Sequence, residues 1–327
     1  MNVLVTGGAG YIGSHATKAL ALAGHLPVTF DNLQRGHREN VKWGPLVEAD
    51  LADESAIVKA LAQYKITAVM HFAAYAYVGE SMQHPRMYFT NNFCNTLNLL
   101  NAMHERQVKR IVFSSTCATY GSLVSLPIRE DHPQRPVNPY GESKLFIEKM
   151  LRWAGECEKL DWVALRYFNA AGADPDGETG EDHDPEPHVI PRALAAANGG
   201  EPLGVFGTDY PTRDGTAVRD YVHVTDIADA HVRALNYLQN GGASTALNLG
   251  TGNGHTVFEL IQAVDSELGV KTPYRLEGRR EGDPPELVAD PSLARQTLGW
   301  ECRHSDLKTI VRTAWAYYKR NSGHRAH

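Results

Sequence analysis

The chain has 327 residues, of which 21% are charged, and its formal net charge at pH 7 is -6. A chain of this length buries a substantial core and forms either two domains or one large α/β unit. The acidic balance and the lack of a basic block argue against nucleic acid as a partner.

Cysteine usage and the N-terminus point to the cellular compartment. The four cysteines lie far apart and form no Cys-x-x-Cys pair, so the sequence predicts neither a disulfide framework nor a zinc site. The first residues enter the strand-like NVLVTGG without an export signal. No apolar run approaches the roughly 18 residues that a membrane span needs. We therefore expect a cytoplasmic protein without a membrane anchor.

A strand, a glycine-rich turn and a helix follow one another at the N-terminus. NVLVT predicts a buried strand, GGAGYIGS follows it, and SHATKALALAG predicts a helix. The spacing of Gly7, Gly10 and Gly13 lets the backbone turn tightly and approach a pyrophosphate. The helix N-terminus favours such an anion through its unpaired amides and its dipole. This order predicts a dinucleotide site.

The second predicted strand, LPVTFDN, ends in Asp31. An acidic side chain at this place accepts hydrogen bonds from both ribose hydroxyls and repels a 2'-phosphate, which favours NAD over NADP. Arg35 is a caution, because an arginine nearby accommodates that phosphate. Asp50 ends a short segment after this strand and is either an adenine contact or a solvated loop residue.

Strands and helices continue to alternate up to residue 168. Further strands are expected at AVMHFAA, RIVFSST and WVALRYF, with a long helix at PRMYFTNNFCNTLNLLNAMHE before the second of these. Five strands alternating with helices predict a parallel, doubly wound Rossmann sheet of the α/β class. On the long helix, Asn91 and Asn92 interrupt the apolar face and need polar partners if they are buried.

The segment NPYGESK places Tyr140 and Lys144 one helical turn apart. Asn138 is a good N-cap and Pro139 suits the first helical position, so a helix should begin here. Residues four apart share a helix face, so phenol and ammonium point to a common spot. A nearby cation lowers the pKa of a tyrosine from about 10, which predicts Tyr140 as a base near neutrality. Taken alone, this spacing also occurs by chance on many helices.

The composition changes after Asn169. AAGADPDGETGEDHDPEPH is rich in glycine, proline and acid, and it predicts a long surface loop or a crossing between domains. His183 and His188 lie among its carboxylates, but a solvated acidic loop is the favoured interpretation, and we expect no metal. The later strand ALNLGTG should return to the main sheet.

These patterns predict two partly interleaved domains. We expect an NAD-binding Rossmann domain at residues 1–168 with a returning segment near 219–250. A smaller C-terminal α/β domain should occupy residues 169–320 and bind the substrate, and residues 321–327 should form a frayed tail.

Seven motifs occur in order: TGGAGYIGSH, HFAA, FSSTCATYG, NPYGESK, LRYFNAAGA, FGTDYPTRDGTAVRDYVHV and RREGD. Together they resemble the extended short-chain dehydrogenase/reductases, and within them the UDP-glucose (UDP-galactose) 4-epimerases, from residue 1 to about 320. The resemblance implies reversible C4 epimerisation of UDP-glucose and UDP-galactose through a transient 4-keto sugar, with tightly bound NAD. It also implies a homodimer joined through the helices that begin near Pro85 and Pro139.

The resemblance assigns roles to individual residues. Tyr140 would remove the proton from the sugar O4, Thr116 would share a proton with that oxygen, and Lys144 would hold the nicotinamide ribose and stabilise the phenolate. The implied NAD contacts are Gly7, Gly10, Tyr11, Ile12, Gly13, Asp31, Asn32, Asp50, Leu51, Phe72, Ala73, Ala74, Asn91, Ser114, Tyr140, Lys144 and Phe168. The implied UDP-sugar contacts are Thr116, Tyr140, Asn169, His188, Val189, Val205, Phe206, Arg219, Arg280, Asp283 and Leu287.

Epimerisation requires that the UDP is held firmly while the hexose turns over. Arg219 and Arg280 match the family's arginines on the UDP diphosphate, where guanidinium bonds phosphate at two points. Asp283 matches the acid on the UDP ribose, Phe206 lies in the strand beside uracil, and Asn169 lies on the pyrophosphate side. Without the motifs, the arginines would be read as surface ion pairs.

Three positions depart from the family pattern. Ala76 stands where some members carry a lysine near the NAD pyrophosphate, which predicts weaker NAD retention. His188 replaces the asparagine of many relatives in the uridine contact. Leu287 occupies the position whose bulk decides whether an N-acetyl group fits, and leucine is neither the large nor the small residue of the clear cases.

Several alternatives follow from these residues. UDP-N-acetylhexosamines stay open as substrates, and HFAAYAYVGES and SSTCATYG also resemble UDP-xylose (UDP-arabinose) 4-epimerases. A 4,6-dehydratase is disfavoured, because Cys117 rather than an acid follows Thr116. A non-catalytic dinucleotide sensor is disfavoured, because both Tyr140 and Lys144 are present.

Overall fold

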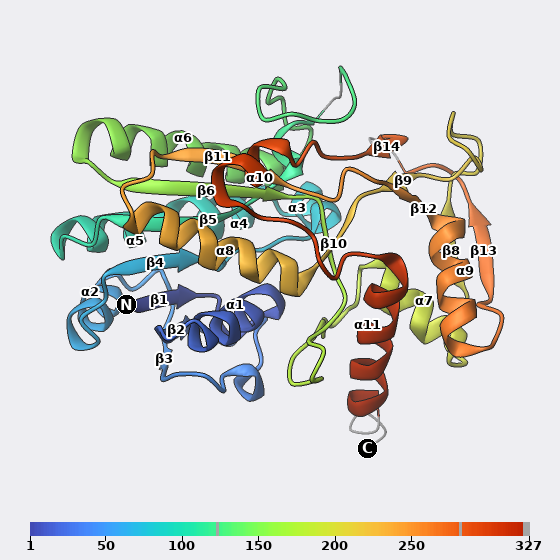
Figure 1. Ribbon diagram of the computed structural model, residues 1–327, viewed down its shortest axis with the longest axis horizontal. Coiled ribbons are helices and arrows are strands. Elements are labelled where there is room, and N and C mark those ends of the chain that lie inside the picture. Colours follow the sequence, from blue (N-terminus) through green and yellow to red (C-terminus); the bar gives the residue numbers. More distant parts are fainter. Residues whose placement is uncertain (122–123, 281–282, 323–327) are drawn as a thin grey trace.

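The computed structural model describes residues 1–121, 124–280 and 283–322. Figure 1 shows a large lobe built on a central sheet and a smaller lobe beside it that contains α7, α9 and α11. Residues 323–327, most of the expected frayed tail, lie outside the described residues. No helix of the described chain is long and apolar enough to cross a membrane.

A parallel sheet of seven strands organises the large lobe. Its order is β11-β6-β5-β4-β1-β2-β3, and all six neighbouring pairs are parallel. The strands are β1 (Asn2–Thr6), β2 (Leu26–Asp31), β3 (Leu46–Glu48), β4 (Ala68–His71), β5 (Arg110–Thr116), β6 (Asp161–Tyr167) and β11 (Thr245–Leu249). The expected doubly wound Rossmann fold is confirmed. The alternation did not predict β3, because three residues are too few to show a periodicity.

Helices cover both faces of this sheet (Figure 1). On one side lie α1 (Tyr11–Leu22), α8 (Val224–Gln239) and α10 (Ser292–Leu298), and on the other α2 (Glu54–Gln63), α5 (Asn95–Glu105) and α6 (Pro139–Glu158). Successive side chains of a strand face opposite sides, so Val3 and Val5 join one core while Leu4 joins the other. Burial on both faces explains why these strands are mostly apolar.

The expected long helix before β5 contains a π-helical turn. After α3 (Val78–Gln83), α4 (Pro85–Tyr88) leads into the π-helix Phe89–Cys94 and then into α5. Asn92 lies buried in this turn, and its side chain bonds both the amide and the carbonyl of Tyr75 and the Ser143 hydroxyl, at 2.8–3.0 Å. Its polar partners therefore come from the loop after β4 and from α6.

The smaller lobe packs three helices around a second core. These are α7 (Val189–Ala197), α9 (Val257–Leu268) and α11 (Leu307–Ser322). Short strands pair in three small sheets: β7 (Asn169–Ala171) with β10 (Tyr221–His223), β8 (Leu203–Phe206) with β13 (Tyr274–Glu277), and β9 (Val218–Arg219) between β12 (His255–Thr256) and β14 (Glu286–Leu287). Two 3-10 turns, Arg38–Asn40 and Cys117–Thr119, complete the elements.

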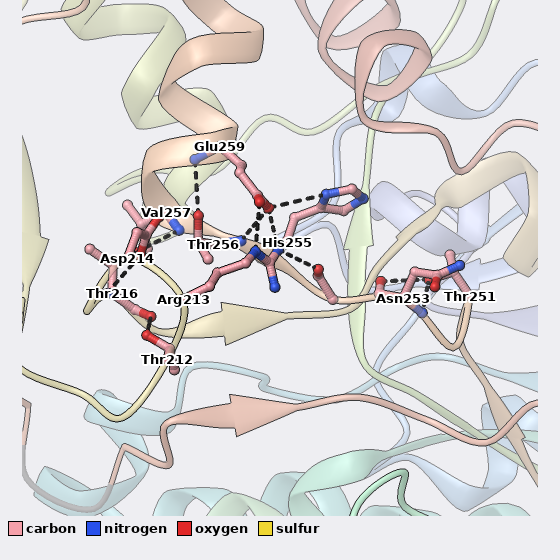
Figure 2. A network of polar contacts seen from close by, with 11 residues as sticks. Thr212, Arg213, Asp214, Thr216, Thr251, Asn253, His255, Thr256, Val257 and Glu259 are labelled. Atoms are coloured by element: carbon pink, nitrogen blue, oxygen red, sulfur yellow. Dashed lines mark hydrogen bonds and ion pairs between the residues drawn. The ribbon is translucent and has the colours of Figure 1, made fainter.

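A polar network secures the loop before β9 to the start of α9 (Figure 2). Arg213 forms a two-point ion pair with Glu259, which also accepts from the Thr256 amide at 3.0 Å in a capping box. The Val257 amide donates to the Thr216 hydroxyl at 3.1 Å. Since β9 follows this loop directly, the network fixes the strand that carries Arg219.

Candidate active site

The first turn of α6 carries the expected catalytic pair. Asn138 caps the helix by accepting a hydrogen bond from the Gly141 amide at 2.8 Å, and Pro139 opens it, as the sequence predicted. A Cβ at Gly141 would lie 2.5 Å from the Ala118 carbonyl oxygen, so the helix start packs closely against the segment after β5. That contact brings Tyr140 beside Thr116 at the end of β5.

Tyr140 remains partly accessible, as a group that meets a substrate must. Burial nevertheless raises the pKa of Tyr140 to about 12, while its hydrogen bond with the Thr116 side chain acts in the opposite direction. The expectation of a lowered tyrosine pKa was wrong. Desolvation disfavours the phenolate and outweighs the hydrogen bond, while the Lys144 ammonium lies 6.0 Å from the centre of the Tyr140 ring.

Lys144 is buried, with 2% of its surface exposed, in the interior between α6 and β5. Its ammonium donates to the Ser114 carbonyl at 2.8 Å and lies 4.9 Å from the centre of the Phe113 ring. Burial lowers the pKa of Lys144 to about 7, and the Glu148 carboxylate one turn later opposes this shift. Because this ammonium is poorly solvated, any nearby negative charge, including a phenolate, stabilises it strongly.

Thr116 ends β5 opposite Tyr167 of β6. Its hydroxyl is buried and accepts a hydrogen bond from the Ala118 amide at 3.1 Å, which starts the 3-10 turn. Two residues earlier, Ser114 hydrogen-bonds the Tyr167 hydroxyl. The carboxyl end of β5 thus presents hydroxyl groups to the start of α6.

In the glycine-rich turn at the start of α1, no side chain covers the backbone at the glycine positions. Gly7 has φ +71°, and a Cβ there would lie 2.6 Å from the Ala73 amide nitrogen. A Cβ at Gly13 would lie 2.1 Å from the Gly7 carbonyl oxygen, so a side chain has no room. This cradle and the helix N-terminus behind it fit a dinucleotide pyrophosphate.

Asp31 lies beside this turn at the end of β2. It is buried, and its carboxylate accepts from the Ala9 and Leu33 amides at 3.0 and 2.9 Å. Burial raises the pKa of Asp31, and these two amide hydrogen bonds lower it in turn. An acid fixed at this position matches the ribose contact of NAD, so the residues present fit the expected cofactor.

Most of the remaining expected NAD contacts lie near the carboxyl ends of the same strands, and Asn91 lies in the π-helix Phe89–Cys94. The Asn32 side chain donates to Asp50 at 2.6 Å, and the Leu51 carbonyl accepts from Asn98 at 3.0 Å. The Asn91 side chain donates to that of Asn92 at 3.0 Å. The centres of the Phe72 and His231 rings lie 4.6 Å apart. Of the others, Tyr11 and Ile12 begin α1, Gly10 precedes them, Ala73 and Ala74 follow β4, and Phe168 follows β6.

A second group of expected residues converges across the short strands of the smaller lobe. Arg219 pairs with Asp283 and donates to the Val218 and Pro284 carbonyls at 2.8 and 3.0 Å. The Arg280 guanidinium stacks 3.8 Å from the centre of the Phe206 ring. Residues from β8, β9 and the segment after β13 therefore form one cationic and aromatic surface.

Burial lowers the pKa of Arg280; the Asp283 carboxylate opposes this shift, and the nearby charges of Arg192 and Arg219 add to it. Three arginines from different elements thus lie close enough to repel one another, which an anionic ligand would relieve. Sequence reasoning missed Arg192. It lies on α7, four residues after His188, and no motif drew attention to it.

The last expected substrate contacts surround these two groups. The Asn169 side chain donates to the Asp220 carbonyl at 3.1 Å, at the junction of β7 with β10. Leu287 pairs in register with Arg219 and packs against the same apolar cluster as Cys117, the residue after Thr116. Val205 is buried in β8, and Val189 begins α7.

Comparison with known proteins identifies the family. The model of the NAD dependent epimerase/dehydratase family matches residues 3–250, which is more than half of the chain. The chain belongs to this family.

Its relatives share both sequence and structure at full length. A UDP-glucose 4-epimerase of Rhizobium meliloti is 52% identical over 326 residues, which cover 98% of both chains. The crystal structure of a UDP-glucose 4-epimerase from Brucella ovis in complex with NAD superposes with a TM-score of 0.95 at 50% identity, covering 97% of this chain and 98% of that one. One from Stenotrophomonas maltophila, with bound NAD and formylated UDP-arabinopyranose, gives 0.96 at 41% identity over 99% of both. The resemblance inferred from the motifs is confirmed.

Within this epimerase/dehydratase fold, the segment at Ala76 contains a feature that sequence reasoning overlooked. The Arg35 guanidinium lies 4.8 Å from the Tyr75 ring centre and 4.7 Å from that of Tyr77, and it pairs with Glu80 at 2.7 Å. A cation is thus held between the two tyrosines that flank Ala76. The Tyr-x-Tyr spacing was visible in the sequence, but its partner Arg35 comes from the loop after β2.

The segment before α7 differs from the solvated acidic loop that the sequence predicted. The Glu181 side chain is 8% exposed and that of His183 is 17% exposed. His188 points its Nδ1 to Glu181 at 2.5 Å. The prediction of full solvation was wrong, because His183 packs against the rings of Tyr11 and Tyr77 and both histidines pair with Glu181. The uridine contact of His188 stays a prediction.

Proposed function

We propose that the protein catalyses the reversible C4 epimerisation of UDP-glucose and UDP-galactose with tightly bound NAD. The observation that carries the proposal is the junction of β5 with α6, which holds Tyr140, Thr116 and Lys144 together at the carboxyl edge of a dinucleotide-type sheet. The family and the names of its full-length relatives support the same activity.

The chain's own groups supply the proton chemistry. Tyr140 takes the proton from the sugar O4, and Thr116, hydrogen-bonded to Tyr140, shares a proton with that oxygen. Lys144 stabilises the phenolate, which offsets the desolvation that raises the tyrosine pKa. NAD, when bound, supplies the reversible oxidation of the sugar at C4.

The UDP side and the hexose side of the site differ in how many polar groups they offer. This difference would let the hexose present either face of C4 to the cofactor. Arg219, Arg280 and Phe206 offer charge and an aromatic ring to the UDP. Around the hexose, Leu287 and Cys117 offer few hydrogen-bonding groups. We propose that the nucleotide is anchored while the sugar rotates between the two hydride-accepting orientations.

We propose a cytoplasmic homodimer as the working form. All four cysteines are free thiols, which fits a reducing compartment. Exposed apolar side chains occur on neighbouring helical segments, with Phe146 39% and Leu97 43% exposed. Phe146 also stacks on Phe89 at 6.0 Å, which joins α6 to the π-helix in one apolar surface. Such a surface suits a partner copy.

The deciding experiment incubates the purified protein with UDP-galactose and no added NAD, and resolves the products by chromatography. UDP-glucose should form without accumulation of NADH. Absence of UDP-glucose would refute the activity. Parallel reactions with UDP-xylose and UDP-N-acetylglucosamine distinguish the preferred sugar, since faster turnover of either would favour that alternative.

A further inference from the structure

The segment before α7 gathers two histidines and two glutamates. One ligand atom from each of Glu181, His183, Glu186 and His188 lies within 4.8 Å of those of the other three. The ion pairs that the described residues give to the two glutamates all come from these two histidines. The cluster therefore combines two carboxylates with two imidazoles, the ligand types that zinc takes from proteins.

Three of the four nitrogen–oxygen separations within the cluster are longer than ordinary hydrogen bonds. The Nδ1 atom of His183 lies 3.4 Å from Oε1 of Glu181 and 3.5 Å from Oε2 of Glu186, and that of His188 lies 3.4 Å from the other Glu186 oxygen, Oε1. Four ligands at about 2.1 Å from a zinc ion in a tetrahedron are about 3.4 Å apart. Only the fourth distance, 2.5 Å between His188 and Glu181, is that of a short hydrogen bond.

One buried ring nitrogen of the cluster has only long ion-pair contacts, at 3.4 and 3.5 Å, and no hydrogen bond. Nδ1 of His183 is buried and makes no hydrogen bond in the described structure, although two carboxylates face it. A buried polar atom without a hydrogen bond is costly and calls for an explanation. A metal ion between the carboxylates and this nitrogen would provide it.

A second cluster of three carboxylates is paired with a lysine of the chain itself and serves as a comparison. Asp174, Asp176 and Glu178 also lie close together, but the Lys18 ammonium sits among them at 2.7–2.9 Å from all three. The ammonium of Lys18 thus already occupies the space among these three carboxylates. In the His–Glu cluster, the ion pairs come from the two imidazoles, and the His188 amide also donates to Glu186 at 2.9 Å.

We propose that Glu181, His183, Glu186 and His188 bind one divalent cation of the zinc type. Two carboxylates would neutralise its charge, and four protein ligands would close its coordination, which is typical of a structural site. The ion would tie the segment to the start of α7, where His188 is the N-cap residue. The ion would also lie near Tyr11 and Tyr77. Their rings contact the His183 ring edge-on, with ring centres 6.4 and 5.7 Å apart.

The test uses the full-length protein without a histidine tag, stripped with EDTA and returned to EDTA-free buffer. Calorimetric titration with Zn²⁺ should show one high-affinity site per chain. Titration with Co²⁺ should give the intense visible absorption of tetrahedral coordination. Either no binding or a weak octahedral cobalt spectrum would overturn the proposal and leave the cluster as ion pairs only.

Two variants locate the site. His183→Ala and Glu186→Gln should each weaken Zn²⁺ binding by at least about tenfold, and two chemically different changes guard against misfolding of either one. His104→Gln is the matched control, because His104 is exposed and faces a single carboxylate, Glu158, at 3.2 Å. If binding is unchanged in both cluster variants, or equally weakened in the control, the ion does not bind at this cluster.

Discussion

Arg166 and Glu148 form a buried two-point ion pair directly behind the candidate active site. Nε and Nη2 of Arg166 lie 2.9 and 2.6 Å from the two carboxylate oxygens, and the side chains are only 5% and 3% exposed. Glu148 lies one turn after Lys144 on α6, and Arg166 lies on β6. The pair therefore joins the helix that carries the catalytic residues to the sheet.

Removing one member of this pair should be strongly destabilising. Glu148→Ala leaves the Arg166 guanidinium buried without its counter-ion, so the free energy of unfolding should fall by about 3–5 kcal/mol. Urea denaturation followed by fluorescence measures this. Glu156→Ala, on the exposed side of the same helix, should change it by less than about 0.5 kcal/mol. A loss below about 1 kcal/mol in the first variant would mean that the pair is not needed.

The buried Lys144 should make stability depend on pH above neutrality. Its pKa is about 7 in the folded protein and 10.5 as the reference value, so between these values the unfolded chain binds the additional proton. Stability should therefore rise with pH across this window, by up to about 1.4 kcal/mol per pH unit, and the penalty is fully present below pH 7. Denaturation of the dinucleotide-free protein from pH 7 to 9.5 tests this.

Lys144→Met is the comparison for that experiment. The variant keeps the apolar stem and lacks the titrating group, so its stability curve should be flatter across the same pH window. Identical slopes in the two proteins would assign the pH dependence to another group.

Tyr140→Phe should abolish most activity while leaving cofactor binding intact. The change removes one hydroxyl and keeps the ring, so kcat should fall by about 10²–10⁴-fold with little change in KM. Initial rates with UDP-galactose measure kcat and KM, and the absorbance of released NAD measures cofactor content. Retention of more than a tenth of the wild-type kcat would remove Tyr140 from the role of base.

Gly13→Ala should strongly weaken NAD binding at the dinucleotide site. The added Cβ would meet the Gly7 carbonyl oxygen at 2.1 Å, so the turn must open and its amides lose their alignment. The purified variant should carry at least about tenfold less NAD than the wild type. Gly79→Ala is the matched control, because no atom lies within 4 Å of its added Cβ and alanine favours the helix.

Leu287→Ala should widen the range of sugars. Leu287 packs against the same apolar cluster as Cys117, the residue after Thr116, so we expect its truncation to open space beside the sugar. The ratio of kcat/KM for UDP-N-acetylglucosamine to that for UDP-galactose should rise by roughly 10–200-fold. Competition assays with both substrates measure the ratio directly. An unchanged ratio would show that another side chain sets the size limit.

The elements that depend on local order were predictable from the sequence. The glycine turn, the cap at Asn138 and the alternation of apolar strands each act within a few residues, and the structure confirms the helix start and the sheet. The π-helical turn was not predictable, because its cause is the contact of Asn92 with residues on two other elements.

Electrostatics and distant contacts were harder to foresee. The Tyr140 pKa was expected to fall because Lys144 is near in sequence, but desolvation depends on the whole surrounding core and outweighs it. Arg192 and Arg35 reach the site from elements whose approach no local pattern encodes. The burial of His183 depends in the same way on Tyr11 and Tyr77.

The helix α6 has two working sides. Tyr140, Lys144 and Glu148 project toward the sheet, whereas Phe146 and Trp153 lie on the opposite side, 39% and 64% exposed. A helix with its side chains is about 10–12 Å across, so the proposed subunit contact and the reacting phenol are separated by one rod. Assembly of two copies would thus restrain the outer side of α6. The position of the Tyr140 phenol in each copy, and with it proton transfer, would then depend on the neighbouring copy.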